Sequence, residues 1–72
     1  MKELNNHPFM DCRTVKAWET TAGGFIQVTD VRDFCYGQYS VEIKVQGGME
    51  NVFASTNLDV CIAWAIHYAE SH

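Results

Sequence analysis

Residues 38–54 read QYSVEIKVQGGMENVFA, and this stretch decides the fold. Apolar and polar side chains alternate through its first half, which predicts a strand with one buried face. The inward-facing side chains are Tyr39, Val41, Ile43 and Val45. Gly47 and Gly48 predict a two-residue hairpin turn. Counting back across that turn places Val41 opposite Ala54, so a second antiparallel strand is expected to follow.

A helix is predicted directly after this hairpin, over residues 56–71. The run Thr56-Asn57-Leu58-Asp59 is typical of a helix start, in which the Thr56 hydroxyl accepts a free backbone N–H. Asp59 then lies at the positive end of the helix dipole. One apolar stripe recurs at helical spacing, formed by Leu58, Cys61, Ile62, Ala65, Ile66 and Ala69. We expect this stripe to cover the inward face of the sheet.

Two further strands are predicted upstream, over residues 13–20 and 25–31, joined by the turn Thr21-Ala22-Gly23-Gly24. A four-residue loop places Ala17 opposite Val28 and Trp18 opposite Gln27, so that Trp18 points outward. The inward-facing side chains of this pair are then Val15, Ala17, Ile26 and Val28.

These elements predict a single α+β domain over residues 1–72. Its sheet is a four-stranded antiparallel β-meander over residues 13–54, covered on one face by a single C-terminal helix over residues 56–71 (ββββα). Residues 1–12 show no periodicity and contain the one proline of the chain, so they are predicted to form an irregular N-terminal arm.

The composition is that of a folded, acidic domain. Of 72 residues, 47% are hydrophobic and 19% charged, and the formal net charge is −4. This charge argues against direct nucleic-acid binding, which needs a basic surface. No run of 18 apolar residues is present, and residues 1–8 lack the apolar core of a signal peptide. We therefore expect a cytoplasmic protein without membrane contact.

Neither a metal site nor a catalytic site is predicted. Cys12, Cys35 and Cys61 lack the two-to-four-residue spacing by which one turn presents two zinc ligands. Cys35 or Ser55 with His67 would supply a nucleophile and a base, but nothing in the spacing brings them together. The chain is therefore expected to be non-enzymatic, to hold no cofactor and to keep its thiols reduced.

The helix carries a second apolar stripe that the core does not require. Val60, Trp64 and Tyr68 follow one another at intervals of four, about 120° around the helix from the first stripe. Two explanations stay open. Either the N-terminal arm covers the stripe with Phe9 and Met10, or two copies of the chain pack together in a two-fold homodimer.

The outer face of the predicted sheet carries aromatic side chains that the core does not need either. These are Trp18, Phe25 and Phe53, ringed by Glu42, Glu50 and Asp30. Large aromatic side chains within a polar rim are typical of protein-binding surfaces. This face is therefore the predicted partner-binding site, and the expected partner is a protein.

The second half of the chain combines Gly47-Gly48 in a hairpin, the segment Val52-Phe53-Ala54-Ser55-Thr56 and a capped, alanine-rich helix. In this order it resembles small accessory proteins of phages and mobile elements, among them anti-CRISPR proteins. That resemblance implies an inhibitor that occludes a host nucleic-acid-handling complex. The same stretch is similar to the strand-to-helix step of HicB-type antitoxins, which implies a regulatory module bound to a cognate toxin. A small-ligand-binding or enzymatic dimer is a third alternative.

Overall fold

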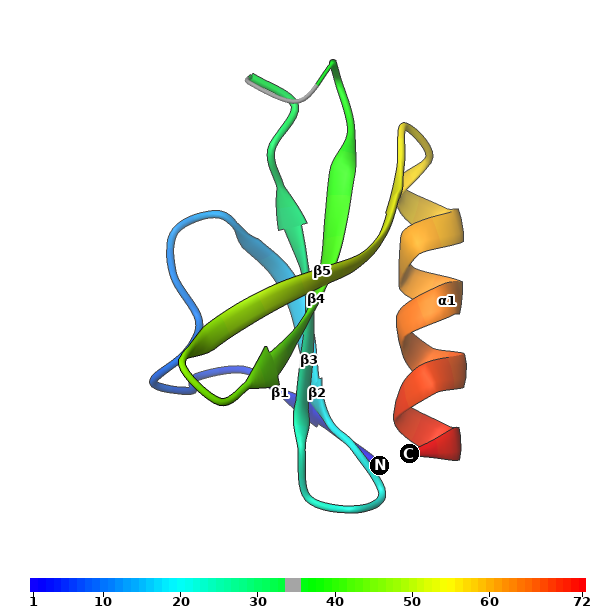
Figure 1. Cartoon of the computed structure of the whole chain (residues 1–72). Coiled ribbons are helices and arrows are strands. Elements are labelled where there is room, and N and C mark those ends of the chain that lie inside the picture. The colour runs from blue at the N-terminus through cyan, green and yellow to red at the C-terminus, as the bar shows by residue number, and fades with distance from the viewer. Residues whose placement is uncertain (34–35) are drawn as a thin grey trace.

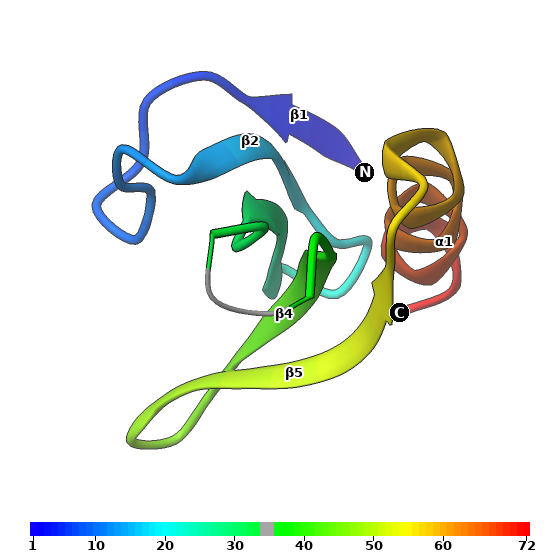
Figure 2. The same ribbon diagram turned by 90° about the horizontal axis from the view of Figure 1, so that it is seen from above.

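A computed structural model describes residues 1–33 and 36–72, and over these residues the protein is an α+β domain, as predicted. Its elements are β1 (Lys2–Leu4), β2 (Thr14–Glu19), β3 (Phe25–Asp30), β4 (Tyr39–Val45), β5 (Gly48–Ser55) and α1 (Leu58–Ser71). The strands form one antiparallel sheet in the order β1-β2-β3-β4-β5, with α1 packed along one side (Figure 1). Seen from above, β1 and β5 lie at opposite ends of a curved sheet (Figure 2).

The predicted irregular arm contains a strand, so the sheet has five strands where the sequence predicted four. Lys2–Leu4 pairs with β2, and Glu3 lies opposite Trp18. A strand of three residues is too short to show the alternation by which strands are recognised in a sequence. Residues 5–13 then cross the outer face of the sheet, as the site below shows.

The N-cap of α1 is one residue later than predicted, and the helix begins at Leu58. The side-chain oxygen of Asn57, and not the Thr56 hydroxyl, accepts the backbone N–H of Val60 at 3.2 Å. The predicted inner stripe does face the sheet, where Cys61, Ala65 and Ala69 are fully buried. Because these three side chains are small and spaced by four, the helix backbone lies close to the strands.

The C-terminal end of α1 is held by the turn between β2 and β3. The backbone N–H of Thr21 donates to the carbonyl of Ala69 at 3.0 Å, and that of Ala22 donates to the carbonyl of His72 at 2.9 Å. The Thr21 hydroxyl also donates to the Ala69 carbonyl, at 3.0 Å. Carbonyls that a helix leaves without partners at its last turn are thus satisfied by a distant hairpin.

The register between β2 and β3 differs by one residue from the predicted one. Trp18 lies opposite Ile26, because the turn closes at Thr20, whose N–H donates to the Gly24 carbonyl at 2.9 Å. The loop therefore consists of residues 21–23 and is one residue shorter than predicted. Gly23 in this loop has a φ of +86°, which glycine tolerates. A one-residue shift exchanges the faces of a strand, so Trp18 enters the core. Val15, which is 38% exposed, is the extra residue where the pairing shifts between Thr14 and Lys16.

The hairpin between β4 and β5 is also shifted. Val45 lies opposite Gly48, so the turn is formed by residues 46 and 47 and not by the two glycines. A bulge opposite the step from Val41 to Glu42 then changes the register again, and Phe53 comes to lie opposite Val41. As a result Phe53 faces α1, whereas the sequence placed it on the outer face.

The core fills the space between the sheet and α1. Its buried members are Trp18, Ile26, Val28, Val41, Cys61, Ala65 and Ala69. Tyr39 and Ile43 pack against them, as the alternation in β4 predicted. The sheet and the helix therefore form the two expected layers.

Candidate functional site

The three aromatic residues of the predicted partner-binding face do not share a surface. Trp18 is 2% exposed in the core beneath α1. Phe25 does point to the outer face but is only 6% exposed, because residues of the N-terminal arm cover it. Phe53 lies on the helix side of the sheet. The predicted face is therefore wrong: two changes of register move Trp18 and Phe53 to the other side, and the N-terminal arm covers Phe25.

An aromatic cluster pins the N-terminal arm over that outer face. The ring of His7 stacks on Phe25 with centroids 4.9 Å apart, and Phe9 meets the edge of Phe25 at 5.5 Å. The ammonium group of Lys44 lies 5.3 Å from the centroid of the Phe9 ring. Phe9 therefore contacts the outer face, and the alternative in which it covers Trp64 is wrong.

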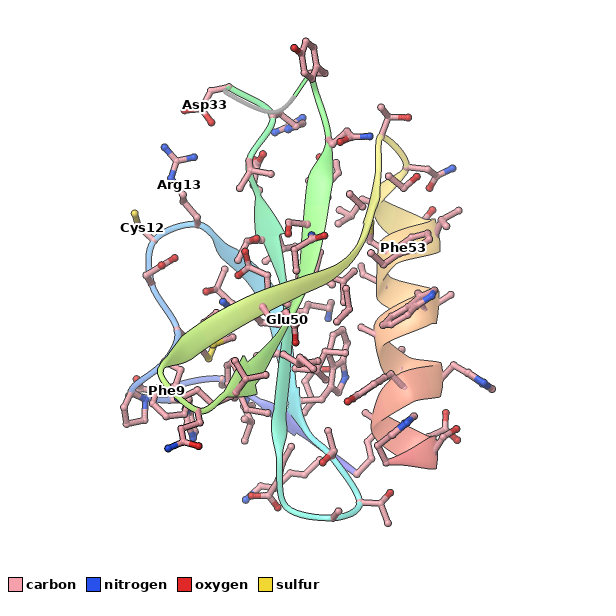
Figure 3. The ribbon with its side chains drawn as sticks, in the orientation of Figure 1. Phe9, Cys12, Arg13, Asp33, Glu50 and Phe53 are labelled. Atoms are coloured by element: carbon pink, nitrogen blue, oxygen red, sulfur yellow. The ribbon has the colours of Figure 1, made fainter. Side chains whose placement is uncertain are left out.

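The three acidic residues predicted around the face have different environments. Glu42 accepts a hydrogen bond from the Gln27 amide at 3.0 Å. Asp30 is ion-paired with Arg32 at 2.9 Å. Glu50 is exposed on β5 and has no ion-pair or hydrogen-bond partner for its carboxylate in the described part of the chain (Figure 3). Only Glu50 remains available to a partner without breaking an existing contact.

The second apolar stripe of the helix forms a continuous stack of rings, which we call the aromatic seam. It consists of Phe53, Trp64, Tyr68 and His72. Successive ring centroids are 5.4, 5.7 and 4.0 Å apart, and the planes are nearly parallel, at 9°, 12° and 7°. The seam runs along the line where β5 meets α1, and Figure 3 shows Phe53 between the two. Spacing by four predicted Trp64 and Tyr68, but only the bulge in β5 brings Phe53 to them.

The seam is incompletely covered. Trp64 and Tyr68 are half-buried, and Val60, one turn before Trp64, is 45% exposed. A hollow of about 230 Å³ adjoins the far end of the seam. It is lined by Thr20, Ala22, Gly24, Phe25, Ile43, Lys44, Tyr68 and His72. Half-buried aromatic side chains beside an open strand edge gain apolar burial when another protein covers them.

Negative charge is unbalanced on β5 and α1. Residues 45–72 contain Glu50, Asp59 and Glu70 but neither lysine nor arginine. None of these three carboxylates has an ion-pair or hydrogen-bond partner among residues 1–33 and 36–72. Among the described residues before position 45, Glu19 alone has a carboxylate without such a contact. The other carboxylates there accept a hydrogen bond or form an ion pair, as in the Arg13–Asp33 pair at 2.8 Å. The field of the molecule is therefore most negative around its last strand and helix.

A second hollow, of about 520 Å³, lies at the opposite end of the sheet. Its lining residues are Cys12, Arg13, Asp30, Arg32 and Asp33. Arg13 binds both carboxylate oxygens of Asp33, at 2.8 and 3.1 Å, and this hydrogen bonding lowers the pKa of Asp33 (Figure 3). Arg32 lowers the pKa of Asp30 in the same way. The charges of this hollow neutralise one another, so it presents no net charge to a ligand.

The residues considered for catalysis are not assembled. The Ser55 hydroxyl accepts the N–H of Asn57 at 3.1 Å and has no hydrogen bond to His67 within the described ranges. The Cys61 thiol is buried beneath α1, and desolvation raises its pKa, which disfavours the reactive thiolate. Cys35 lies outside the described residues.

Over residues 1–33 and 36–72, no group of three or more His, Cys, Asp or Glu side chains is placed to hold a metal ion. Within the same ranges, no helix combines the length and the apolar character that crossing a membrane requires.

Comparison with protein-family models, with curated proteins and with solved structures finds no match to this chain. The function is therefore argued from the residues and their geometry.

Proposed function

We propose that the chain is a small, non-enzymatic protein-binding module that blocks the phosphate-binding surface of a nucleic-acid-handling protein, in the manner of an anti-CRISPR inhibitor. The observation that carries this proposal is the unbalanced negative charge of β5 and α1. Asp59 and Glu70 are exposed on the helix, and neither forms an ion pair among residues 1–33 and 36–72. Proteins that bind nucleic acid present arginine and lysine for phosphate contacts, and such a surface complements these carboxylates.

The placement of the two carboxylates supports binding to a protein surface of this kind. Asp59 is in the first turn of α1 and Glu70 in the last, so they mark the two ends of one helix. A helix of 14 residues is about 21 Å long, which is the span of several phosphates along a nucleic-acid strand. The exposed residues between them on this side of the helix are Ala63 and His67, and neither forms an ion pair with the two carboxylates in the described part of the chain.

The proposal is tested by capturing a partner from bacterial lysate on the immobilised full chain. We expect a stoichiometric protein partner that binds nucleic acid and is released by added DNA or RNA. The double variant Asp59→Asn, Glu70→Gln should weaken capture by up to about tenfold, because exposed ion pairs contribute modestly each.

The matched control is the double variant Glu3→Gln, Glu19→Gln, which changes the net charge by the same amount. It should retain the partner, because these residues lie on β1 and β2. Equal weakening by both variants would mean that only net charge matters, and the proposal would fail. Failure to recover any stoichiometric partner also contradicts it, and recovery of a toxin would favour the antitoxin-like alternative.

A further inference from the structure

One edge of the sheet lacks the protection that natural edge strands usually have. The β1 edge is three residues long and carries Lys2 and Glu3, so it is short and charged. The β5 edge is eight residues long and contains no lysine or proline. It carries Glu50 and the bulge, and the Asn51 amide donates to the Phe53 carbonyl at 3.1 Å. Strand edges expose backbone N–H and C=O groups, and long uncharged edges pair readily with another strand.

The aromatic seam lies on the same side of the molecule as this edge. Phe53 belongs to β5 and stacks on Trp64 of α1, so the edge and the seam form one continuous surface. At 100° per residue, Asp59 and Glu70 lie roughly 180° around the helix from Tyr68. The surface formed by β5, Val60 and the seam therefore includes a single charged side chain, Glu50.

We propose that a second copy of this chain occupies that surface, related to the first by a two-fold axis. A two-fold axis places β5 antiparallel to its own copy, so that each edge supplies the acceptors and donors that the other needs. Charged residues are depleted and aromatic residues enriched in the centres of such interfaces, which is the composition of this surface. A heterologous basic partner instead fits the opposite side of the helix, where Asp59 and Glu70 lie.

The dimensions of the molecule agree with this assignment. Its principal extents are 32, 22 and 21 Å, so one broad side covers roughly 700 Å². A stable interface buries about 800 Å² on each partner, and accessible area exceeds the flat projection. An eight-residue strand is about 26 Å long and neighbouring strands lie about 4.8 Å apart, so the β5 edge alone is too narrow for such an interface, which requires Val60 and the seam as well.

The proposed dimer is independent of the proposed function: it covers Glu50 on β5 and leaves open the side of α1 that carries Asp59 and Glu70. Pairing through β5 keeps Asp59 and Glu70 of both copies exposed, because they lie about 80–100° around the helix from Val60 and about 120–140° from Trp64. The oligomeric state is measured on the purified chain alone, so it succeeds or fails whether or not a partner is captured.

The test is sedimentation equilibrium of the full chain from about 1 to 200 µM, where the dimer predicts roughly 16 kDa against 8.2 kDa for one chain. Val60→Glu introduces a carboxylate on each side of the two-fold axis and should raise the dimer dissociation constant at least about thirtyfold. Ala63→Glu is the matched control, because Ala63 is exposed on the same helix but away from the seam. This variant should dimerise as the unaltered chain does.

Hydrogen exchange on the unaltered chain gives a reading that does not depend on any variant folding. Backbone amides of residues 48–55 should exchange faster on dilution, as dimers dissociate and the β5 edge is exposed. A concentration-independent mass of 8.2 kDa overturns the proposal. So does a dimer that Val60→Glu and Ala63→Glu weaken equally, or one in which exchange over residues 48–55 does not change with concentration.

Discussion

Replacing Trp18 by alanine separates the sequence-derived register from the structure. The alternation in residues 13–20 placed Trp18 outside and Val15 inside. The structure reverses both, with Trp18 2% exposed and Val15 38% exposed on the same strand. Trp18→Ala and Val15→Ala are therefore a matched pair. In the predicted register Val15→Ala would lower the free energy of unfolding more, whereas in the structure Trp18→Ala should lower it more.

The magnitude follows from burial. A buried tryptophan removes about 150–250 Å² from water, which at about 25 cal/mol per Å² is worth about 4–6 kcal/mol. Core Trp→Ala substitutions cost about 3–5 kcal/mol, whereas truncating the partly exposed Val15 should cost less than about 1 kcal/mol. The whole domain has about 4–11 kcal/mol of stability at its length. Trp18→Ala should therefore leave a large unfolded population in water.

The assay is urea unfolding of the unaltered chain and both variants, followed by far-UV circular dichroism. Trp64 fluorescence supplies a second probe that survives both substitutions. If Trp18→Ala is unfolded before urea is added, Trp18→Phe keeps part of the apolar volume and gives a measurable midpoint. A Trp18 substitution that costs less than Val15→Ala would refute the register and, with it, the core described above.

Three further predictions follow from contacts outside the core. Thr21→Ala removes the hydroxyl that donates to the Ala69 carbonyl, and should lower the free energy of unfolding by about 1 kcal/mol in thermal or urea denaturation, whereas an unchanged stability would show that this end of α1 does not need the turn. The exposed Cys12 should be alkylated by iodoacetamide in the folded protein, whereas Cys61 should react only on unfolding, because burial raises the pKa of its thiol. Mass spectrometry of peptides measures both reactions, and equal labelling of the two thiols would contradict the burial of Cys61. Arg13 lowers the pKa of Asp33 and Arg32 lowers that of Asp30, so the ion pairs contribute stability above the ordinary aspartate pKa near 4 and lose it as the pH falls through the lower folded values. NMR titration of the unaltered chain should give a midpoint for Asp33 below that in Arg13→Gln, and a midpoint for Asp30 below that in Arg32→Gln. Both differences should shrink in 1 M salt.

The parts of the fold that the sequence predicted correctly have long, clean patterns. Tyr39, Val41 and Ile43 alternate with polar residues and face the helix as expected. The inner stripe of α1 extends over four turns, so a single ambiguous position does not change its direction. In both elements many residues specify the same face, and the prediction holds.

The predictions that were wrong, the faces of Trp18 and Phe53, each depend on a change of one residue in the strand pairing. A hydrogen bond from the Thr20 N–H to Gly24 shortens the first hairpin loop, and this alone moves Trp18 from surface to core. The bulge in β5 moves Phe53 to the helix side, and nothing in the alternation of residues 49–55 indicates where a bulge falls. The outer-face site was lost through these two shifts, whereas Trp64 and Tyr68 were found because their spacing lies within one helix.

Both ends of α1 are attached to the sheet: its start continues covalently from β5, and its end is hydrogen-bonded to Thr21 and Ala22. The backbone passes from β3 through β4 and β5 into α1, and the helix end is fastened again to the turn that leads into β3. The helix therefore cannot swing away from the sheet as a lid, since it is covalently continuous with β5 at one end and tied at the other. Stiffness of this kind holds the spacing between Phe53 and Trp64, so a protein that docks there meets a surface already in its bound shape and loses little conformational entropy on association.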